Sequence, residues 1–132
     1  MKKLLISIAM MLFASQTAIA ENTELVSKWY SALKTSNEAM FKELIADDAT
    51  LEINPLEVTQ TKAEYIAALN NWEAKAKDLT LIMKGVKSTG ETTVRAMVCY
   101  KFPETSSLNE ERFVFLDGKI TNFSQNTRSD EC

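Results

Sequence analysis

The sequence predicts one α+β domain that follows a secretory signal. Apolar residues recur with helical spacing in the first half of the chain and alternate with polar residues in the second half. Helices followed by consecutive strands are typical of α+β folds. No internal repeat, low-complexity tract or Pro/Gly-rich linker interrupts the 132 residues, so the length and the pattern both indicate a single domain.

The first twenty residues have the three regions of a signal peptide. Two lysines come first, an apolar run follows over residues 4–14, and the small residues Ala18 and Ala20 precede the polar Glu21. The run is short for a membrane-spanning helix, so a permanent anchor is the weaker interpretation. We expect cleavage after Ala20, which leaves residues 21–132 as one exported domain, periplasmic or secreted, that does not associate with the membrane.

The composition excludes several classes of function. Histidine is absent, which removes the Ser-His-Asp triad, a histidine general base and most catalytic zinc sites. The 15 basic residues are scattered among 18 acidic ones, whereas a nucleic-acid-binding protein usually gathers basic residues on one face. We therefore expect no nucleic-acid partner, and the sequence indicates no cofactor.

Two helices are predicted directly after the signal. The first runs from about Glu24 to Lys34, with Asn22 or Thr23 as its cap. The second begins at Thr35, since Glu38 three residues on completes a capping-box spacing. The apolar faces consist of Leu25, Val26, Trp29 and Leu33 in the first helix, and of Met40, Phe41, Leu44 and Ile45 in the second.

A short strand and a third helix come next. Residues 50–53 alternate and predict a strand that buries Leu51 and Ile53 before Pro55 ends it. Thr61 with Glu64 repeats the capping-box spacing and opens a helix that extends to about Lys77. Its apolar stripe is Tyr65, Ile66, Leu69, Trp72 and Ala76.

From Leu79 the chain predicts consecutive antiparallel strands, with a turn at 88–91, a loop from Pro103 to Asn109 and a tight turn at Asp117-Gly118. A two-residue loop at Thr89-Gly90 gives the first hairpin an apolar face of Leu79, Leu81, Met83, Val94, Ala96, Val98 and Tyr100. The opposite face carries Thr80, Lys84, Thr93, Arg95, Cys99 and Lys101, with Ile82, Val86 and Met97 among them.

The same counting around Asp117-Gly118 gives the second hairpin two mixed faces. One holds Glu111, Phe113, Phe115, Ile120, Asn122 and Ser124, and the other holds Arg112, Val114, Leu116, Thr121, Phe123 and Gln125. A sheet with two partly apolar faces must cover helices with one of them. For the other we expect a second subunit, in a homodimer that buries Ile82, Val86, Met97 and Phe123.

The two cysteines, Cys99 and Cys132, both lie after the signal. An exported domain can pair them where its compartment is oxidising. The alternative is a half-buried strand residue and a free thiol near the chain end, and the sequence alone leaves both open because it gives no Cα separation.

Four segments carry a resemblance to a known family, namely Trp29–Leu33, Ile45–Thr50, Lys62–Ile66 and Asp117–Ile120. Their order resembles the nuclear transport factor 2-like (NTF2-like) superfamily, and within it the SnoaL-like and ketosteroid isomerase-like branch. The resemblance implies a cone-shaped fold with three N-terminal helices packed on a curved, mostly antiparallel sheet. Members of this superfamily include isomerases, dehydratases, cyclases and noncatalytic binding modules, so the fold does not settle the function.

The resemblance also implies site residues. The tyrosine of the isomerase oxyanion hole falls at Tyr30, its protonated acid falls near Glu111, and its carboxylate base falls at Ile53 or Asn54. Proton abstraction needs a base, and neither isoleucine nor asparagine can serve. The alternative interpretation places the Tyr30 hydroxyl at the surface and pairs Glu111 with a neighbouring lysine.

The leading hypothesis is therefore a binding or accessory module that holds a small, mostly apolar ligand. The expected ligand-binding residues are Tyr30, Leu51, Ile53, Tyr65, Trp72, Glu111, Phe113 and Asn122, although core packing is the commoner role of such aromatic residues.

Two alternatives remain open. One is an isomerase or dehydratase that uses Tyr30 and Glu111 with Glu52 or Asp48 as its base, and the other is a noncatalytic homodimer. Asp47-Asp48 lacks a third ligand at a recognisable spacing, so no metal site is expected.

Overall fold

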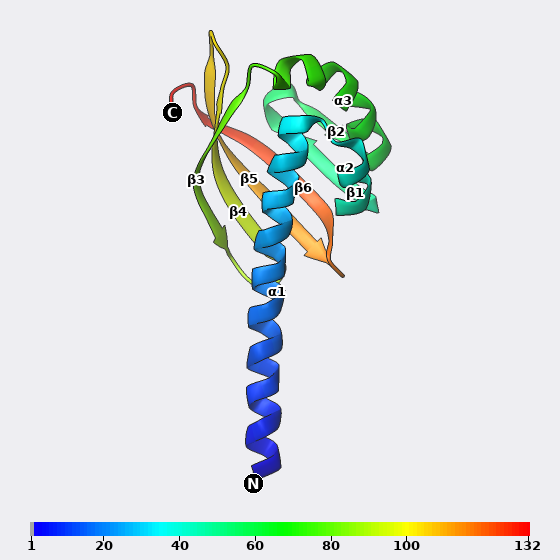
Figure 1. Cartoon of the computed structure of the whole chain (residues 1–132), viewed down its shortest axis with the longest axis vertical. Helices are drawn as coiled ribbons and strands as arrows, with labels where there is room; N and C mark the ends of the chain where they lie inside the picture. The colour runs from blue at the N-terminus through cyan, green and yellow to red at the C-terminus, as the bar shows by residue number, and fades with distance from the viewer. Residues whose placement is uncertain (1) are drawn as a thin grey trace.

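The computed structural model describes the backbone of residues 2–132 and the side chains of residues 17–132. Its helices lie on one face of a six-stranded sheet (Figure 1). In chain order the elements are α1 (Lys2–Thr35), α2 (Glu38–Leu44), β1 (Ile45–Ile53), the 3₁₀ turn η1 (Asn54–Leu56), β2 (Val58–Gln60), α3 (Lys62–Ala76), β3 (Thr80–Ser88), β4 (Thr93–Lys101), β5 (Ser106–Leu116) and β6 (Lys119–Ser129).

The signal peptide predicted for residues 1–20 falls mostly outside the residues whose side chains are described. Within the part that is described, none of the helices combines the length and the apolar character that a membrane crossing needs.

The strands follow the order β2-β1-β6-β5-β4-β3, and every neighbouring pair is antiparallel except β1 with β6. The inner face of the sheet is the one covered by helices, and on β4 it presents Val94, Ala96, Val98 and Tyr100, all buried. The outer face presents the residues between them. The predicted α+β class, with helices before a mostly antiparallel curved sheet, is confirmed.

The core lies between α1 and the inner face and is centred on Trp29. This side chain is fully buried, and its ring lies 4.8 Å from those of Phe41 and Phe123 and 5.4 Å from that of Phe113. Rings at these separations bury large apolar areas and add edge-to-face attraction. The apolar face predicted for the first helix is therefore confirmed.

The predicted start of the first helix is wrong in this chain. Asn22 and Thr23 do not cap α1 but lie inside it, because the helix continues through the preceding residues. The Asn22 side chain instead donates to the Glu91 carbonyl at 2.8 Å, which ties α1 to the β3–β4 loop. The Thr23 hydroxyl donates back to the Ile19 carbonyl at 2.6 Å.

The second helix starts two residues later than predicted. Asn37 is the N-cap of α2, and its side chain accepts from the Met40 amide at 3.1 Å. Thr35 still belongs to α1 and donates to the Ser31 carbonyl at 2.9 Å, while Ser36 reverses the chain in a left-handed conformation with φ of 51°. Because α1 extends through Thr35, this threonine is not the N-cap of α2.

The third helix agrees with its prediction. The Thr61 hydroxyl accepts from the Glu64 amide at 3.2 Å, and the Glu64 carboxylate accepts from the Thr61 amide at 3.1 Å, so the capping box is complete. The preceding strand, β1, begins at Ile45 rather than at Thr50 because its first residues also lie along β6. It ends as predicted at Ile53.

A bulge changes the face of one predicted β3 residue. Leu81 lies opposite Tyr100 on the inner face as predicted, but the register shifts between Met83 and Gly85. Val86 therefore lies opposite Ala96 on the inner face, not on the outer one. The β3–β4 loop has four residues, 89–92, rather than two.

A second bulge, in β6, changes the faces on which several β6 residues lie. Asp117 and Gly118 form the predicted two-residue turn, with φ of 52° and 75°, and Leu116 pairs with Lys119 across it. Phe115 pairs with Ile120 and the adjacent Val114 pairs with Asn122, so Thr121 is an extra residue in β6. As a result Phe123 and Gln125 lie on the inner face, opposite Phe113 and Glu111, while Asn122 and Ser124 lie outside, opposite Val114 and Arg112. The faces predicted for these β6 residues are wrong.

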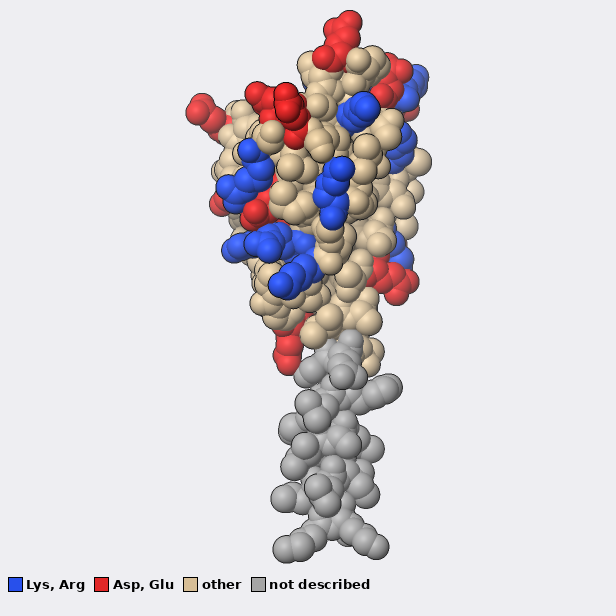
Figure 2. Space-filling view, turned by 90° about the vertical axis from the view of Figure 1, so that its left-hand side faces the viewer, with Lys and Arg blue, Asp and Glu red and all other residues tan. Residues whose placement is uncertain are grey.

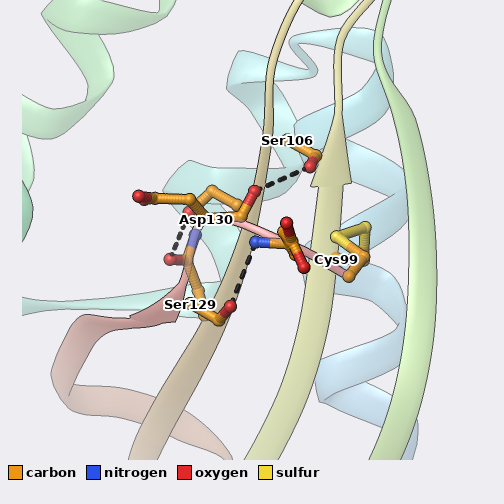
Figure 3. The surroundings of a disulfide bond; sticks show 8 residues. Cys99, Ser106, Ser129 and Asp130 are labelled. Carbon is orange, nitrogen blue, oxygen red and sulfur yellow. Dashed lines mark hydrogen bonds between the residues drawn. A yellow bond between two sulfur atoms is a disulfide. The ribbon is translucent and has the colours of Figure 1, made fainter.

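The outer face carries a disulfide between Cys99 and Cys132, with Cα atoms 5.7 Å apart (Figure 3). This separation is ordinary for a disulfide. Cys99 is fully buried, whereas the mostly polar face predicted for it indicated exposure to solvent. The Ser106 hydroxyl donates to the Asp130 carbonyl at 2.9 Å beside the bridge. The end of the chain is thereby fixed against β4 and β5.

The outer face also carries a row of cations. Lys87 lies opposite Arg95, and Arg95 lies opposite Arg112, so three like charges are direct cross-strand neighbours. Lys and Arg side chains gather on the side of the molecule near β3 (Figure 2). Among the described residues none of the three has an ion-pair partner. Such rows weaken a sheet slightly, and this one is solvated.

Candidate functional site

The candidate site is a cavity of about 250 Å³ between α3 and the inner face of the sheet. This volume is slightly below the range of pockets for drug-sized ligands, so the cavity suits a small molecule. It is lined by five aromatic residues (Trp29, Tyr65, Trp72, Tyr100 and Phe123), six aliphatic ones (Leu33, Ile53, Leu56, Val58, Ala68 and Leu69) and four polar ones (Gln60, Asn71, Lys75 and Gln125).

Helix α3 positions one wall of the cavity. Tyr65, Leu69 and Trp72 are spaced by four and three residues, so they share one side of the helix. The capping box fixes where this helix begins, and the Trp72 indole donates to the Leu33 carbonyl at 2.8 Å. That bond links α3 to α1 and fixes the Trp72 ring against the cavity.

Strands β4, β5 and β6 supply the polar end of the site. Glu111 on β5 is fully buried, and its carboxyl accepts hydrogen bonds from three neighbours. The Tyr30 hydroxyl donates to Oε1 at 2.5 Å, the Tyr100 hydroxyl lies 2.9 Å from both oxygens, and the Gln125 amide donates to Oε2 at 2.5 Å. Tyr100 and Gln125 line the cavity, so Glu111 lies directly behind its wall.

The electrostatics of this group follow from its burial. Removal from water raises the pKa of Glu111 above its ordinary value of 4.5, and the donors Tyr30, Gln125 and Tyr100 partly offset that rise. Burial is the main cause that raises the pKa of Tyr30, Tyr65 and Tyr100, and the negative charge of Glu111 is the second cause. The three hydroxyls therefore stay protonated. The group is thus a carboxyl held among neutral donors.

The predicted site residues separate into five locations. Ile53, Tyr65 and Trp72 line the cavity. Leu51 and Phe113 are fully buried in the core, and Glu111 lies behind the cavity wall. Tyr30 contacts Glu111 but lines a different hollow. Asn122 is exposed on the outer face because of the β6 bulge, so the structure does not bring it to the site.

The alternative interpretation of Glu111 as an edge charge beside a lysine is wrong, and so is a surface position for the Tyr30 hydroxyl. Both groups are buried and bonded to each other. The two candidate bases lie elsewhere, since Glu52 is exposed on the outer face and Asp48 is exposed on β1. Ile53, one of the two positions implied for the base, faces the cavity.

Twelve of the fifteen lining residues were not predicted as site residues, and two of these, Tyr100 and Gln125, bond to Glu111. Tyr100 was expected on the inner face, but nothing in its neighbourhood indicated a bond to Glu111. Gln125 was expected on the wrong face, because no Gly or Pro in the sequence marks the β6 bulge. Both bonds join residues brought together only by strand pairing.

A larger hollow of about 580 Å³ lies between α1 and the edge strand β3. It is an open groove with Tyr30 on its wall and Met83 and Val86 among its exposed apolar residues. The cavity beside α3 remains the candidate site, since its aromatic walls enclose more of a ligand and Tyr100 and Gln125 add polar groups to the wall.

Solved structures with the same arrangement are numerous. A proposed ketosteroid isomerase from Kribbella flavida superposes with a TM-score of 0.72 at 14% identity, over 84% of this chain and 80% of its own. An NTF2-like protein of unknown function from Burkholderia xenovorans gives 0.70 at 11% identity, over 83% and 84% of the two chains. The fold is NTF2-like.

A further NTF2-like neighbour is IdmH, a proposed polyketide cyclase from Streptomyces antibioticus, with a TM-score of 0.68 at 14% identity, over 80% of this chain and 90% of its own. No family model matches the sequence, and no curated protein matches it. At these identities the likeness establishes the fold, as the resemblance implied, and leaves the function to the site.

Proposed function

We propose that the chain is exported and that its NTF2-like domain binds a small, mostly apolar molecule in the cavity beside α3. The observation that carries this proposal is the cavity itself, which combines aromatic and aliphatic walls with one polar end at Tyr100 and Gln125. Such a mixture is typical of small-molecule sites, where apolar walls supply affinity and few polar groups fix orientation.

An unused hydrogen-bond donor in a residue of the cavity lining supports binding. Among the described residues the buried Nε1 of Trp29 has no acceptor. Buried polar groups are normally satisfied, so a ligand oxygen or a water molecule that reached this donor would offset the cost of leaving it unpaired.

Binding without catalysis is favoured because the cavity lacks a base. Its lining contains no carboxylate, and Ile53 lies at the wall where the isomerase resemblance implied the base. Glu111 is already bonded to three donors and faces the cavity only through Tyr100 and Gln125.

A thermal-shift screen with steroids, polyketides, fatty acids and aromatic metabolites tests the proposal. We expect one class to raise the melting temperature of the mature protein, because a ligand that binds only the folded state stabilises it. Ala68 lines the cavity whereas the adjacent Ala67 does not. Ala68→Trp should therefore abolish the shift and Ala67→Trp should retain it.

No stabilisation by any class would contradict the proposal. Equal stabilisation of Ala68→Trp and wild type would show that binding occurs elsewhere, as in the α1–β3 groove.

Export is tested separately by mass spectrometry of cell fractions after expression with the full sequence. The expected product begins at Glu21 and occurs in the periplasm or the medium. A full-length chain confined to the cytoplasm would contradict this part of the proposal.

A further inference from the structure

The cavity lining holds one basic side chain, that of Lys75. Lys75 belongs to the last turn of α3, and no aspartate or glutamate is among the fifteen residues of the lining. Lys75 has no ion-pair partner among the described residues and is exposed at the cavity mouth. A lone cation beside an apolar cavity favours an anionic group on whatever occupies it.

The position of Lys75 along α3 fixes where that group would lie. Tyr65, Trp72 and Lys75 occupy one side of the helix, and the ten steps from Tyr65 to Lys75 span roughly 15 Å of its axis. An elongated ligand can therefore place its apolar body against Tyr65 and Trp72 while its charged end reaches Lys75.

The part of the cavity wall formed by Tyr100 and Gln125 disfavours a ligand carboxylate. Glu111 lies behind Tyr100 and Gln125, and no cation lies among the residues that bond to it. A ligand carboxylate placed there would lose its hydration next to another acid, whereas at the mouth it remains partly in water and beside Lys75. Charge thus orients the ligand in one direction.

We propose that the ligand is a small hydrophobic monocarboxylic acid that binds with its apolar body inside the cavity and its carboxylate at Lys75. This inference rests on the proposed function and specifies the class of molecule and its orientation. It makes Lys75 a specificity-determining residue.

Lys75 also has a structural role, since a cation in the last turn of a helix interacts favourably with the helix dipole. A purely structural lysine would change stability without changing which ligand is preferred. The test therefore compares ligands that differ only in charge.

Isothermal titration of the mature protein at pH 8 compares 2-naphthoate with 2-naphthamide, and decanoate with decanamide. We expect wild type to bind at least one acid about fivefold more tightly than its amide, the magnitude of a partly exposed charge-assisted contact. Lys75→Gln should lose this preference. Lys77→Gln should keep it, because Lys77 is exposed on the same helix end outside the lining.

The two proposals fail differently. Equal binding of acid and amide by wild type, or a preference kept in Lys75→Gln, overturns the monocarboxylate inference but leaves an apolar binding site. Failure of all four probes to bind wild type overturns both. Loss of binding in Ala68→Trp locates the probes in this cavity, and unchanged binding in that variant overturns the assignment.

Discussion

At the scale of single residues, Glu111 is the most unusual group in the molecule. A carboxyl with no exposed surface keeps its place because Tyr30, Tyr100 and Gln125 donate to it. Charged groups are seldom buried without such partners, and removing them would leave a costly unpaired group. The three donors come from α1, β4 and β6, so this one side chain also ties those elements to β5.

Glu111 should make stability depend on pH. Its folded pKa lies above the unfolded value near 4.5, so its contribution is fully present below that pH and is lost as pH rises through the folded pKa. We expect the free energy of unfolding, measured in urea between pH 4 and pH 8, to fall with rising pH in wild type. Glu111→Gln, which cannot ionise, should show a flatter profile.

The control for this measurement is Glu110→Gln on the outer face of the same strand, where the carboxylate bonds to Arg128. It should keep the wild-type slope. A Glu111→Gln profile as steep as that of wild type would contradict the assignment. Glu111→Ala should cost about 2–4 kcal/mol, because it leaves buried donors unsatisfied.

At the scale of elements, the two bulges decide what each strand contributes. The β3 bulge brings Val86 to the inner face, and the β6 bulge brings Phe123 to Trp29 and Gln125 to Glu111. A single inserted residue in a strand inverts every side chain after it. Alternation in the sequence therefore predicted strands β3 and β6 but gave the wrong face after each bulge.

The corrected start of α2 gives a second prediction. Asn37→Ala should destabilise the protein by about 1 kcal/mol, because it removes the acceptor for the Met40 amide at the helix start. Thr35→Ala should cost less, since Thr35 lies inside α1 and bonds only to a carbonyl of its own helix. Urea denaturation of both variants checks this order, and a larger loss for Thr35→Ala would restore the capping box predicted there.

At the scale of the whole molecule, the disulfide connects the end of the chain to the middle of the sheet. Cys99 and Cys132 are 33 residues apart in sequence, and a loop of that size stabilises the folded state by about 4 kcal/mol through restriction of the unfolded chain. Cys132→Ser should lower the free energy of unfolding by about 2–4 kcal/mol. Reducing agent should have the same effect on wild type and no further effect on the variant.

The homodimer stays a prediction, but the four apolar residues proposed for its interface do not lie on one face of the sheet. Phe123 and Val86 lie on the inner face, and only Ile82 and Met97 remain outside. If the outer face still pairs two copies, light scattering of the mature protein should give twice the monomer mass, and Met97→Asp should reduce it. A dimer unaffected by Met97→Asp would require another surface, and a monomeric wild type would contradict the prediction.

Local patterns in the sequence predicted the class of fold, the presence of three helices, the Asp117-Gly118 turn and three residues of the cavity lining, Ile53, Tyr65 and Trp72. Helical spacing and a local capping box placed Tyr65 and Trp72 on α3, and Asp117-Gly118 fixed a hairpin, because these signals act between residues a few positions apart. Which polar groups contact one another depends on the tertiary structure. Glu111 bonds to Tyr30, 81 residues away, and to Gln125 through a bulge that no residue type marks, since pairing across strands depends on register and packing of the whole sheet.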